Sequence, residues 1–217
     1  MTTLNDELSL HLAEQLLNIG AVTLSPRNPF TWASGLRSPV YCDNRLTLAY
    51  PELRREITHG FIQVIEKYNI ACDSIAGIAT AGIPHAAWLA ERSEKPMAYV
   101  RGVAKSHGRR NRIEGRLESG TDVVLVEDLV STGMSSTAAI SPVLDAGCRV
   151  SAVLAIFTYS LATAREAFQR AGVPLYTLTD FLALIEVARL CEAIDDDELL
   201  SLRNWYEDPI AWSDKNS

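Results

Sequence analysis

The sequence is poor in cysteine, and its four cysteines lie far apart with no C-x-x-C pair. This spacing argues against a structural zinc site and against a disulfide framework, and it fits a reducing compartment. The N-terminal stretch MTTLNDELSLHLAEQLL carries acids early and lacks the apolar core of a signal peptide. The longest run without Asp, Glu, Lys or Arg, residues 74–90, is broken by Gly82, Pro84 and His85, so it is unsuited to crossing a bilayer. We therefore expect a cytoplasmic protein with no membrane partner.

The chain also lacks an excess of positive charge. Its 20 Lys and Arg face 27 Asp and Glu, which gives a net charge of −7 and a pI near 5.1 and excludes general nucleic-acid binding. Repeats and low-complexity segments are absent. With 217 residues, of which 47% are hydrophobic, the chain can form one well-buried domain with an appendage.

Hydrophobic spacing predicts alternating strands and helices after a first helix that ends at Gly20. Residues 21–50 contain short aromatic and β-branched pieces separated by proline and glycine, which indicates a small irregular β region. The expected strands are 74–79, 97–101, 121–126, 150–157 and 174–178, and the expected helices are 51–68, 82–93, 134–146, 161–171, 180–190 and 195–206. This alternation predicts an α/β fold with a parallel, Rossmann-like sheet covered by helices on both faces. We expect a single domain, 1–217, with a hood at about 1–50, a core at about 51–190 and a C-terminal helical tail at about 191–217.

The stretch VVLVEDLVSTGMSST, residues 123–137, is the most informative in the chain. Its four aliphatic residues suit a strand buried on both faces. Glu127 and Asp128 stand where that strand would end, and the small turn Ser131-Thr132-Gly133 follows. Ligands of parallel α/β sheets bind at the carboxyl ends of strands, where a turn into a helix offers N–H groups to a phosphate. The sequence therefore predicts a site for a phosphorylated sugar, with the acids on sugar hydroxyls or beside a metal.

This stretch resembles the phosphoribosyl-diphosphate signature of type I phosphoribosyltransferases, an aliphatic run and two acids followed by T-x-G-x-(S/T). The resemblance implies that Glu127 and Asp128 hold the ribose hydroxyls and that the turn 131–135 wraps the 5′-phosphate. The second Asp-Asp pair of the family is Glu-Asp here, which keeps both charges. The implied phosphoribosyl diphosphate contacts in this stretch are Glu127, Asp128, Leu129, Val130, Ser131, Thr132, Gly133, Met134 and Ser135.

A basic, glycine-punctuated segment at 101–116 is the second candidate. Six of the 20 basic residues fall in it: Arg101, Lys105, Arg109, Arg110, Arg112 and Arg116. Glycines permit hinge motion, and fixed cations on a closing loop can neutralise a departing diphosphate and exclude water. The alternative is a solvated basic loop that contacts nothing.

The pattern R-x-x-x-K-x-H-G at 101–108 is similar to the catalytic loop of orotate phosphoribosyltransferases. The resemblance implies that Arg101, Lys105 and His107 contact the diphosphate and act in catalysis together with Asp128. Bacterial members often carry a second basic residue after the arginine, whereas this chain has Gly102. The resemblance also implies a homodimer in which the 101–116 loop serves the partner's active site.

The segment FTWASGLRSPVYCDNRLTLAYPELR resembles the hood that covers the base in the same family. Some members have lysine where Ala33 and Ala81 stand, so the contacts of those lysines are expected from Arg37 or Arg45 instead. The implied orotate contacts are Ser131, Arg45 and Tyr41, while a purely structural role for the segment 34–45 is the alternative.

The resemblance implies transfer of ribose 5-phosphate from phosphoribosyl diphosphate to orotate, giving orotidine 5′-phosphate and diphosphate. It also implies Mg²⁺ held through the substrate, with no direct protein ligands. One alternative is a purine or uracil phosphoribosyltransferase, which would share the 127–135 site but lack the hood and loop patterns. Another is a non-catalytic regulator of the same fold, which would need a DNA-binding appendage and a basic chain.

Overall fold

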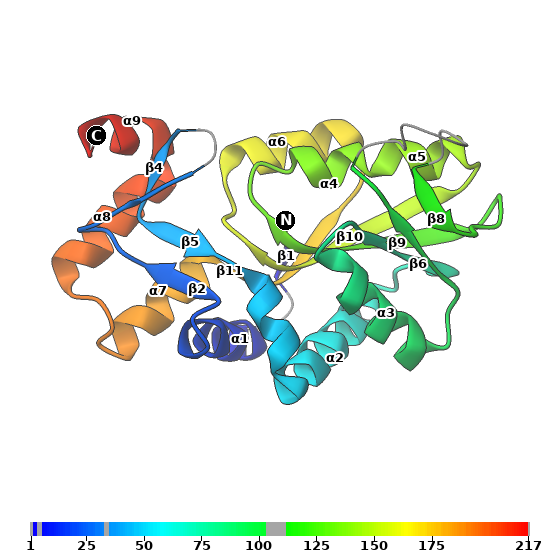
Figure 1. Cartoon of the computed structure of the whole chain (residues 1–217), viewed down its shortest axis with the longest axis horizontal. Coiled ribbons are helices and arrows are strands. Elements are labelled where there is room, and N and C mark those ends of the chain that lie inside the picture. Colours follow the sequence, from blue (N-terminus) through cyan, green and yellow to red (C-terminus); the bar gives the residue numbers. More distant parts are fainter. Residues whose placement is uncertain (1, 4–5, 33–34, 103–111, 217) are drawn as a thin grey trace.

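A seven-stranded sheet with the order β1-β11-β10-β9-β6-β7-β8 runs through the centre of the protein (Figure 1). The computed structural model describes residues 2–3, 6–32, 35–102 and 112–216. The sheet pairs are parallel except for β7 with β8, which is antiparallel. Its strands are β1 (Thr2–Thr3), β6 (Ser74–Ile78), β7 (Met97–Val100), β8 (Ile113–Gly115), β9 (Asp122–Val130), β10 (Arg149–Thr158) and β11 (Leu175–Asp180). The expected parallel α/β sheet is therefore present, with β8 added inside the segment expected to be a loop.

The central strand β9 is buried on both faces, as its aliphatic run predicts. Val124 and Val126 belong to one hydrophobic core, whereas Val123 and Leu125 belong to the other. The strand continues four residues beyond the expected end at 126, because β10 pairs with it as far as Val130. The two acids consequently lie within the last part of the strand rather than after it.

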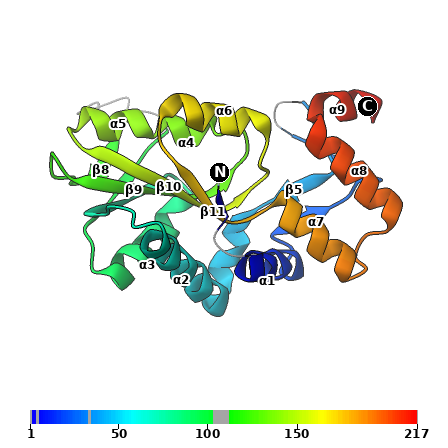
Figure 2. The same cartoon turned by 180° about the vertical axis from the view of Figure 1, so that it is seen from behind.

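Helices cover both faces of the sheet (Figures 1 and 2). On one face lie α1 (Asp6–Asn18), α2 (Pro51–Lys67) and α3 (Gly82–Ser93), and on the other lie α4 (Met134–Ala138), α5 (Ile140–Asp145) and α6 (Ala162–Ala171). The helix expected at 134–146 is thus two short helices that meet at Ala139. Pro142 has no N–H to donate to the Ala138 carbonyl, which explains the interruption.

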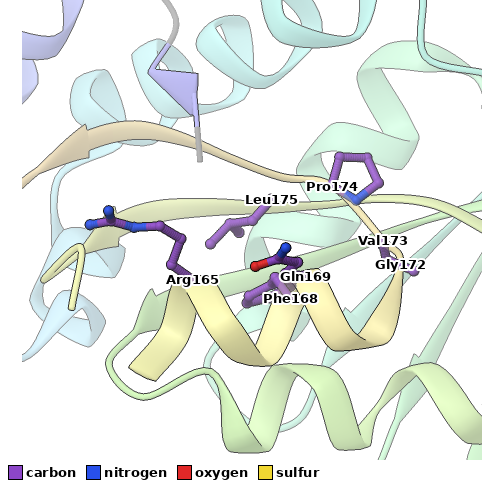
Figure 3. A pocket seen from close by; sticks show the side chains of 7 residues that line it. All are labelled: Arg165, Phe168, Gln169, Gly172, Val173, Pro174 and Leu175. Atoms are coloured by element: carbon purple, nitrogen blue, oxygen red, sulfur yellow. The ribbon is translucent and has the colours of Figure 1, made fainter. Parts of the chain in front are cut away.

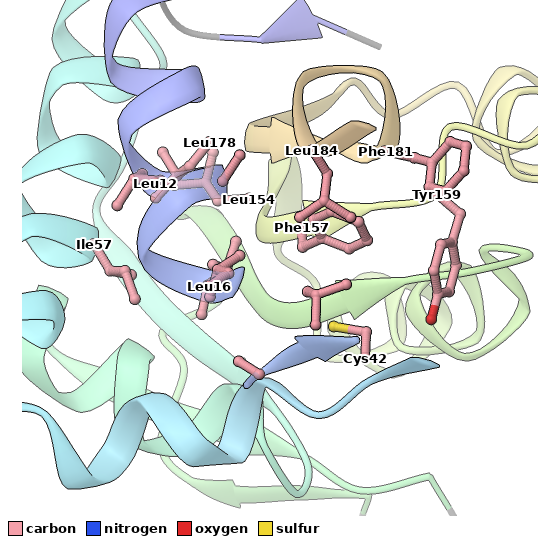
Figure 4. Close-up of a cluster of buried hydrophobic side chains, with 14 of the residues drawn as sticks. Leu12, Leu16, Cys42, Ile57, Leu154, Phe157, Tyr159, Leu178, Phe181 and Leu184 are labelled. Carbon is pink, nitrogen blue, oxygen red and sulfur yellow. The ribbon is translucent and has the colours of Figure 1, made fainter. Parts of the chain in front are cut away.

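The larger core lies between α1, α2, the sheet and α7 (Phe181–Leu190) (Figure 4). Its side chains come from segments far apart in the sequence, so it fixes the hood region against the sheet. The residues labelled in Figure 4 are Leu12, Leu16, Cys42, Ile57, Leu154, Phe157, Tyr159, Leu178, Phe181 and Leu184. Among the described residues, no helix is both long and apolar enough to span a membrane.

The hood contains two small antiparallel pairs, β2 (Val22–Leu24) with β5 (Val40–Cys42) and β3 (Phe30–Thr31) with β4 (Arg37–Ser38), followed by the 3-10 helix η1 (Asn44–Ala49). The C-terminal tail packs on this hood. It forms two helices, α8 (Asp196–Glu207) and α9 (Pro209–Lys215), where one was expected.

Ion pairs, a hydrogen bond and a ring contact join the tail to the hood. Arg27 pairs with Asp195 and Glu198, the Arg37 amide donates to Ser213 Oγ at 3.0 Å, and Trp32 meets Trp205 edge-on with 5.8 Å between ring centroids. The tail therefore packs on the hood and stabilises its position.

Candidate active site

A cavity of about 480 Å³ opens at the carboxyl ends of β6 and β9, beside the hood. Its walls come from three segments: the end of β5 with the start of η1, the turn between β6 and α3, and the end of β9 with the turn that follows. The lining residues are Cys42, Asp43, Arg45, Ala79, Thr80, Ala81, Glu127, Asp128, Leu129, Ser131, Thr132, Gly133 and Ser135. This is the edge of the sheet where parallel α/β proteins bind ligands.

The two acids of β9 are adjacent, Glu127 being buried and Asp128 half-buried. Glu127 is 6% exposed, and its Oε2 accepts a hydrogen bond from the buried Ser136 hydroxyl at 3.3 Å. Its Oε1 accepts the Asp128 amide at 3.2 Å. Burial raises the pKa of both carboxyls, and the Asp128 charge raises that of Glu127 further. The pair therefore favours a ligand that donates hydrogen bonds or brings positive charge, since either compensates the buried negative charge.

The turn after β9 exposes small polar groups to the cavity. Gly133 has φ +78°, a left-handed conformation that glycine adopts readily, and it begins α4. Within the described part of the chain, no hydrogen bond uses the hydroxyls of Thr132 or Ser135, and both residues are exposed. These hydroxyls and the neighbouring N–H groups are available to a phosphate.

Two residues expected in this turn point elsewhere. Val130 is buried and its carbonyl accepts the Thr158 hydroxyl, while the side chain of Met134 is 74% exposed. Neither residue lines the cavity.

The turn between β6 and α3 forms the opposite wall. Ala79, Thr80 and Ala81 line the cavity there, and the Ala79–Thr80 peptide bond is cis. The start of α3 is in close contact with β9, since a Cβ on Gly82 would lie 2.2 Å from the Val126 carbonyl oxygen. This close approach places the turn directly beside Glu127.

On the hood side, Arg45 is held by Asp43. The Arg45 Nε and Nη2 atoms donate to the two Asp43 oxygens at 2.6 and 2.8 Å, and this pairing lowers the pKa of Asp43. Both residues line the cavity. Tyr41 instead packs against Phe30, with 5.6 Å between ring centroids, and is not a lining residue of the cavity.

Arg101 lies just after β7 at the far side of β6. Its amide donates to the Arg112 carbonyl at 2.8 Å, and its guanidinium is 3.5 Å from Glu114. Lys105, His107 and Ala33 lie outside the described residues.

A second, smaller cavity of about 330 Å³ lies between α6 and the amino end of β11 (Figure 3). It is lined by Arg165, Phe168, Gln169, Gly172, Val173, Pro174 and Leu175. It opens at the amino end of β11, whereas the acids lie toward the carboxyl end of β9, and the two cavities have no lining residue in common.

Sequence patterns identified the β9 acids and the following turn but missed several residues at the cavity. Asp43 and Thr80 line it, Ser136 bonds Glu127, and Asn44 donates from the hood to the Asp128 carbonyl at 2.7 Å. Of these residues, only Asp43 and Asn44 could have been found from the sequence, because they directly precede the predicted Arg45.

Known proteins resemble this chain along nearly its whole length. A family model described as a phosphoribosyl transferase domain matches residues 47–173. The chain is 52% identical over 201 residues to the orotate phosphoribosyltransferase of Bacillus caldolyticus, covering 93% of this chain and 97% of that protein. It is 50% identical over 214 residues to the orotate phosphoribosyltransferase of Cutibacterium acnes, covering 99% of each.

Solved structures agree with these relatives. The crystal structure of orotate phosphoribosyltransferase from Aeropyrum pernix matches with a TM-score of 0.73 and 30% identity, covering 85% of this chain and 99% of that one. Leishmania donovani UMP synthase matches with a TM-score of 0.77 and 26% identity, covering 92% of this chain and 42% of that one. The resemblance seen in the sequence is thus confirmed, and the chain belongs to the orotate phosphoribosyltransferases, enzymes with the type I phosphoribosyltransferase fold.

Proposed function

We propose that this phosphoribosyltransferase binds phosphoribosyl diphosphate in the cavity at the end of β9 and transfers its ribose 5-phosphate group to orotate. The observation that carries this assignment is the juxtaposition of a buried carboxyl group, Glu127, and a half-buried one, Asp128, with a small polar turn at the carboxyl ends of the parallel strands. Glu127 and Asp128 would accept hydrogen bonds from the ribose hydroxyls. The turn 131–135 would enclose the 5′-phosphate with N–H groups and hydroxyls.

The chemistry requires little of the protein beyond placement and charge. The bond between ribose C1 and the diphosphate oxygen would break while a bond from C1 to the orotate ring nitrogen forms, and the proton of the ring nitrogen would pass to the departing diphosphate. An electron-poor ribosyl centre of this kind needs alignment of the two reactants and neutralisation of the leaving group. The carboxylates beside the ribose would also favour positive charge that develops at C1.

Mg²⁺ is the proposed cofactor, because a diphosphate and ribose hydroxyls present the hard oxygen donors that it prefers. Among the described residues, no group of three or more His, Cys, Asp or Glu side chains is arranged to hold a metal. Asp128 would be an outer contact of an ion held mainly by substrate and water. When bound, the ion supplies charge neutralisation on the diphosphate.

The base and the leaving group would be held from the hood and from the 101–116 loop. Arg45, which lines the cavity, would pair with the orotate carboxylate in competition with Asp43, and Ser131, which also lines the cavity, would be a second orotate contact. A contact from Tyr41 remains a prediction. Arg101, Lys105 and His107 would neutralise the diphosphate, with the loop acting in the partner's site of a homodimer. We place the enzyme in the cytoplasm, which the four free cysteines support.

A panel of bases tests the substrate. With phosphoribosyl diphosphate and Mg²⁺, we expect kcat/KM for orotate to exceed that for uracil or hypoxanthine by at least about 10³-fold. Uracil and hypoxanthine lack the carboxylate of orotate, so the polar groups that bind this carboxylate would be left unpaired. Orotate consumption is followed by its absorbance, and the other bases by separation of the nucleotide product. Equal efficiency with uracil or hypoxanthine would overturn orotate as the substrate while leaving the family assignment intact.

A further inference from the structure

The side chain of Asn44 connects the hood directly to the main chain of the site. Asn44 follows β5, begins η1 and is 1% exposed. Its amide nitrogen donates to the carbonyl oxygen of Asp128 at 2.7 Å. Within the described part of the hood, no other residue donates a hydrogen bond to the β9 acids, so this bond is the direct polar link between the two elements.

The orientation of that amide is determined by its neighbours. The Cys42 thiol lies 3.3 Å from the Asn44 Oδ1 atom, which accepts, so the nitrogen faces Asp128. The Thr47 hydroxyl donates its single hydrogen to the main-chain carbonyl oxygen of Asn44 at 2.6 Å. Thr47 can then only accept from His85 Nε2 at 3.4 Å, which assigns the imidazole hydrogen to Nε2. These bonds hold the main chain of Asn44 through Thr47, while its side-chain amide separately donates to Asp128.

The hydrogen bond from Asn44 lies at a part of β9 that no longer pairs with β6. β6 pairs with β9 only as far as Gly77 and Val126, whereas β10 continues beside β9 to Val130. Asp128 therefore lies on a segment held by a strand on one side alone. The Asn44 amide supplies a hydrogen bond to this segment, and a buried carbonyl left without a donor would be costly.

We propose that Asn44 is a positioning residue, which fixes the main chain at Asp128 and thereby aims the Asp128 carboxylate at the ribose of phosphoribosyl diphosphate. This inference rests on the ribose-binding role proposed above for Asp128. Asn44 does not line the cavity itself, so it acts through Asp128. Removal of the Asn44 side chain should therefore weaken binding of phosphoribosyl diphosphate more than binding of orotate.

Two substitutions and one control test the inference. Asn44→Ala removes the donor, and Asn44→Asp keeps the shape but replaces the donor with a carboxylate that repels the Asp128 carbonyl. Ser25→Ala is the control, because it removes an exposed hood hydrogen bond, from Ser25 Oγ to the Asn28 carbonyl at 2.8 Å, away from the cavity. Steady-state kinetics with each substrate varied, together with thermal unfolding, are measured for all three variants.

We expect both Asn44 variants to raise KM for phosphoribosyl diphosphate about tenfold, the scale of one lost hydrogen bond to a buried group, with KM for orotate changed less than about twofold. Burial at this position and the nearby Asp128 charge should raise the pKa of the new carboxyl group. The Asn44→Asp defect, relative to wild type at the same pH, should therefore shrink from pH 8 to pH 6, because a protonated carboxyl can again donate to the carbonyl. The Asn44→Ala defect should not change with pH, and Ser25→Ala should match wild type.

Wild-type kinetic constants accompanied only by a lower unfolding temperature would overturn the inference and leave Asn44 with a purely structural role. Should either variant fail to fold, Asn44→Ser, whose hydroxyl is too short to reach the carbonyl, is judged by the same criterion. Wild-type enzyme that forms no product from orotate would instead contradict the proposed function, so the two failures are separable.

Discussion

At the scale of single residues, the buried polar groups around the site are held in defined states by their neighbours. Asn44, Ser136 and Thr47 each direct a hydrogen bond toward a particular oxygen. His85 is 1% exposed, and its Nδ1 atom has no hydrogen-bond partner among the described residues. Burial, and to a lesser degree the Arg54 charge, lowers the pKa of His85 to about 4, so this imidazole is neutral in the folded enzyme.

His85 should make stability depend on pH. The unfolded state takes up a proton on His85 below about pH 6.5, whereas the folded state does so only near pH 4, so stability falls as the pH drops through this window, by about 3 kcal/mol in all. In His85→Gln this pH-dependent decrease in the free energy of unfolding should disappear, which urea unfolding at several pH values would measure. His59→Gln, which removes an imidazole at an exposed position of α2, is the control. An unchanged pH slope in His85→Gln would contradict the assignment of a buried neutral imidazole.

Residues that combine a distinctive type with a distinctive position are predictable from the sequence. Two adjacent acids after an aliphatic run at a strand end are recognisable from local pattern alone. Asn44 and Ser136 are not, because their roles depend on contacts between segments 84 and 9 positions apart. No local pattern distinguishes a buried Asn that donates to a strand from one that caps a turn.

At the scale of elements, the site depends on how closely α3 packs against β9. Gly77 and Gly82 leave no room for a side chain, since a Cβ at these positions would lie 2.7 Å from Ile83 Cα and 2.2 Å from the Val126 carbonyl oxygen. The turn 79–81 can therefore reach the cavity beside Glu127. This packing was not expected from the sequence, where Gly82 indicated only the start of a helix.

Gly82→Ala should destabilise the enzyme by about 3 kcal/mol, because the added methyl group collides with main-chain atoms that cannot rotate away. The midpoint of urea unfolding measures this change. Gly102→Ala is a matched control, since a Cβ at Gly102 would meet no atom within 4 Å. Equal stability of the two variants would show that α3 can shift away from β9.

Element boundaries that differ from expectation have local or tertiary causes. Pro142 divides the helix expected at 134–146, and a proline inside a helical pattern is a local signal that the sequence itself contains. The extension of β9 to Val130 depends instead on pairing with β10, and β8 depends on pairing with β7. Pairing between distant segments overrides local preference in both cases.

At the scale of the whole molecule, the two ends of the chain meet at the hood, whose residues Cys42, Asp43 and Arg45 line the cavity. The hood strands rest on α8 and α9 through the Arg27 ion pairs and the Trp32–Trp205 contact. Local patterns predicted a helical tail but not its place, because nothing in a short window indicates which distant surface a helix covers. The cavity thus lies between the carboxyl ends of the sheet strands and a hood that packs on the C-terminal helices.

The proposed exchange of loops between subunits predicts complementation. If the loop 101–116 serves the partner's site, inactive Lys105→Ala and inactive Asp128→Asn homodimers should regain activity when mixed. Statistical exchange gives mixed dimers for half of the population, each with one intact site of two, so activity should approach about a quarter of wild type. Subunit exchange itself is followed with differently tagged chains. Demonstrated exchange without recovery would mean that each chain closes its own loop over its own site.

The central claim, that the carboxyl end of β9 binds phosphoribosyl diphosphate, is tested most directly by comparing acids at the two ends of this strand. Asp128 lines the cavity, whereas Asp122 begins the strand and pairs with Arg149 at 2.8 Å on the opposite edge of the sheet. Calorimetric titration of each variant with phosphoribosyl diphosphate and Mg²⁺ measures the contribution of each acid.

We predict that Asp128→Asn weakens this binding about 10- to 100-fold, the scale of a lost hydrogen bond to a charged group, while Asp122→Asn binds as wild type does. Equal affinity in Asp128→Asn, Asp122→Asn and wild type would contradict the account, because the ribose would then lie elsewhere.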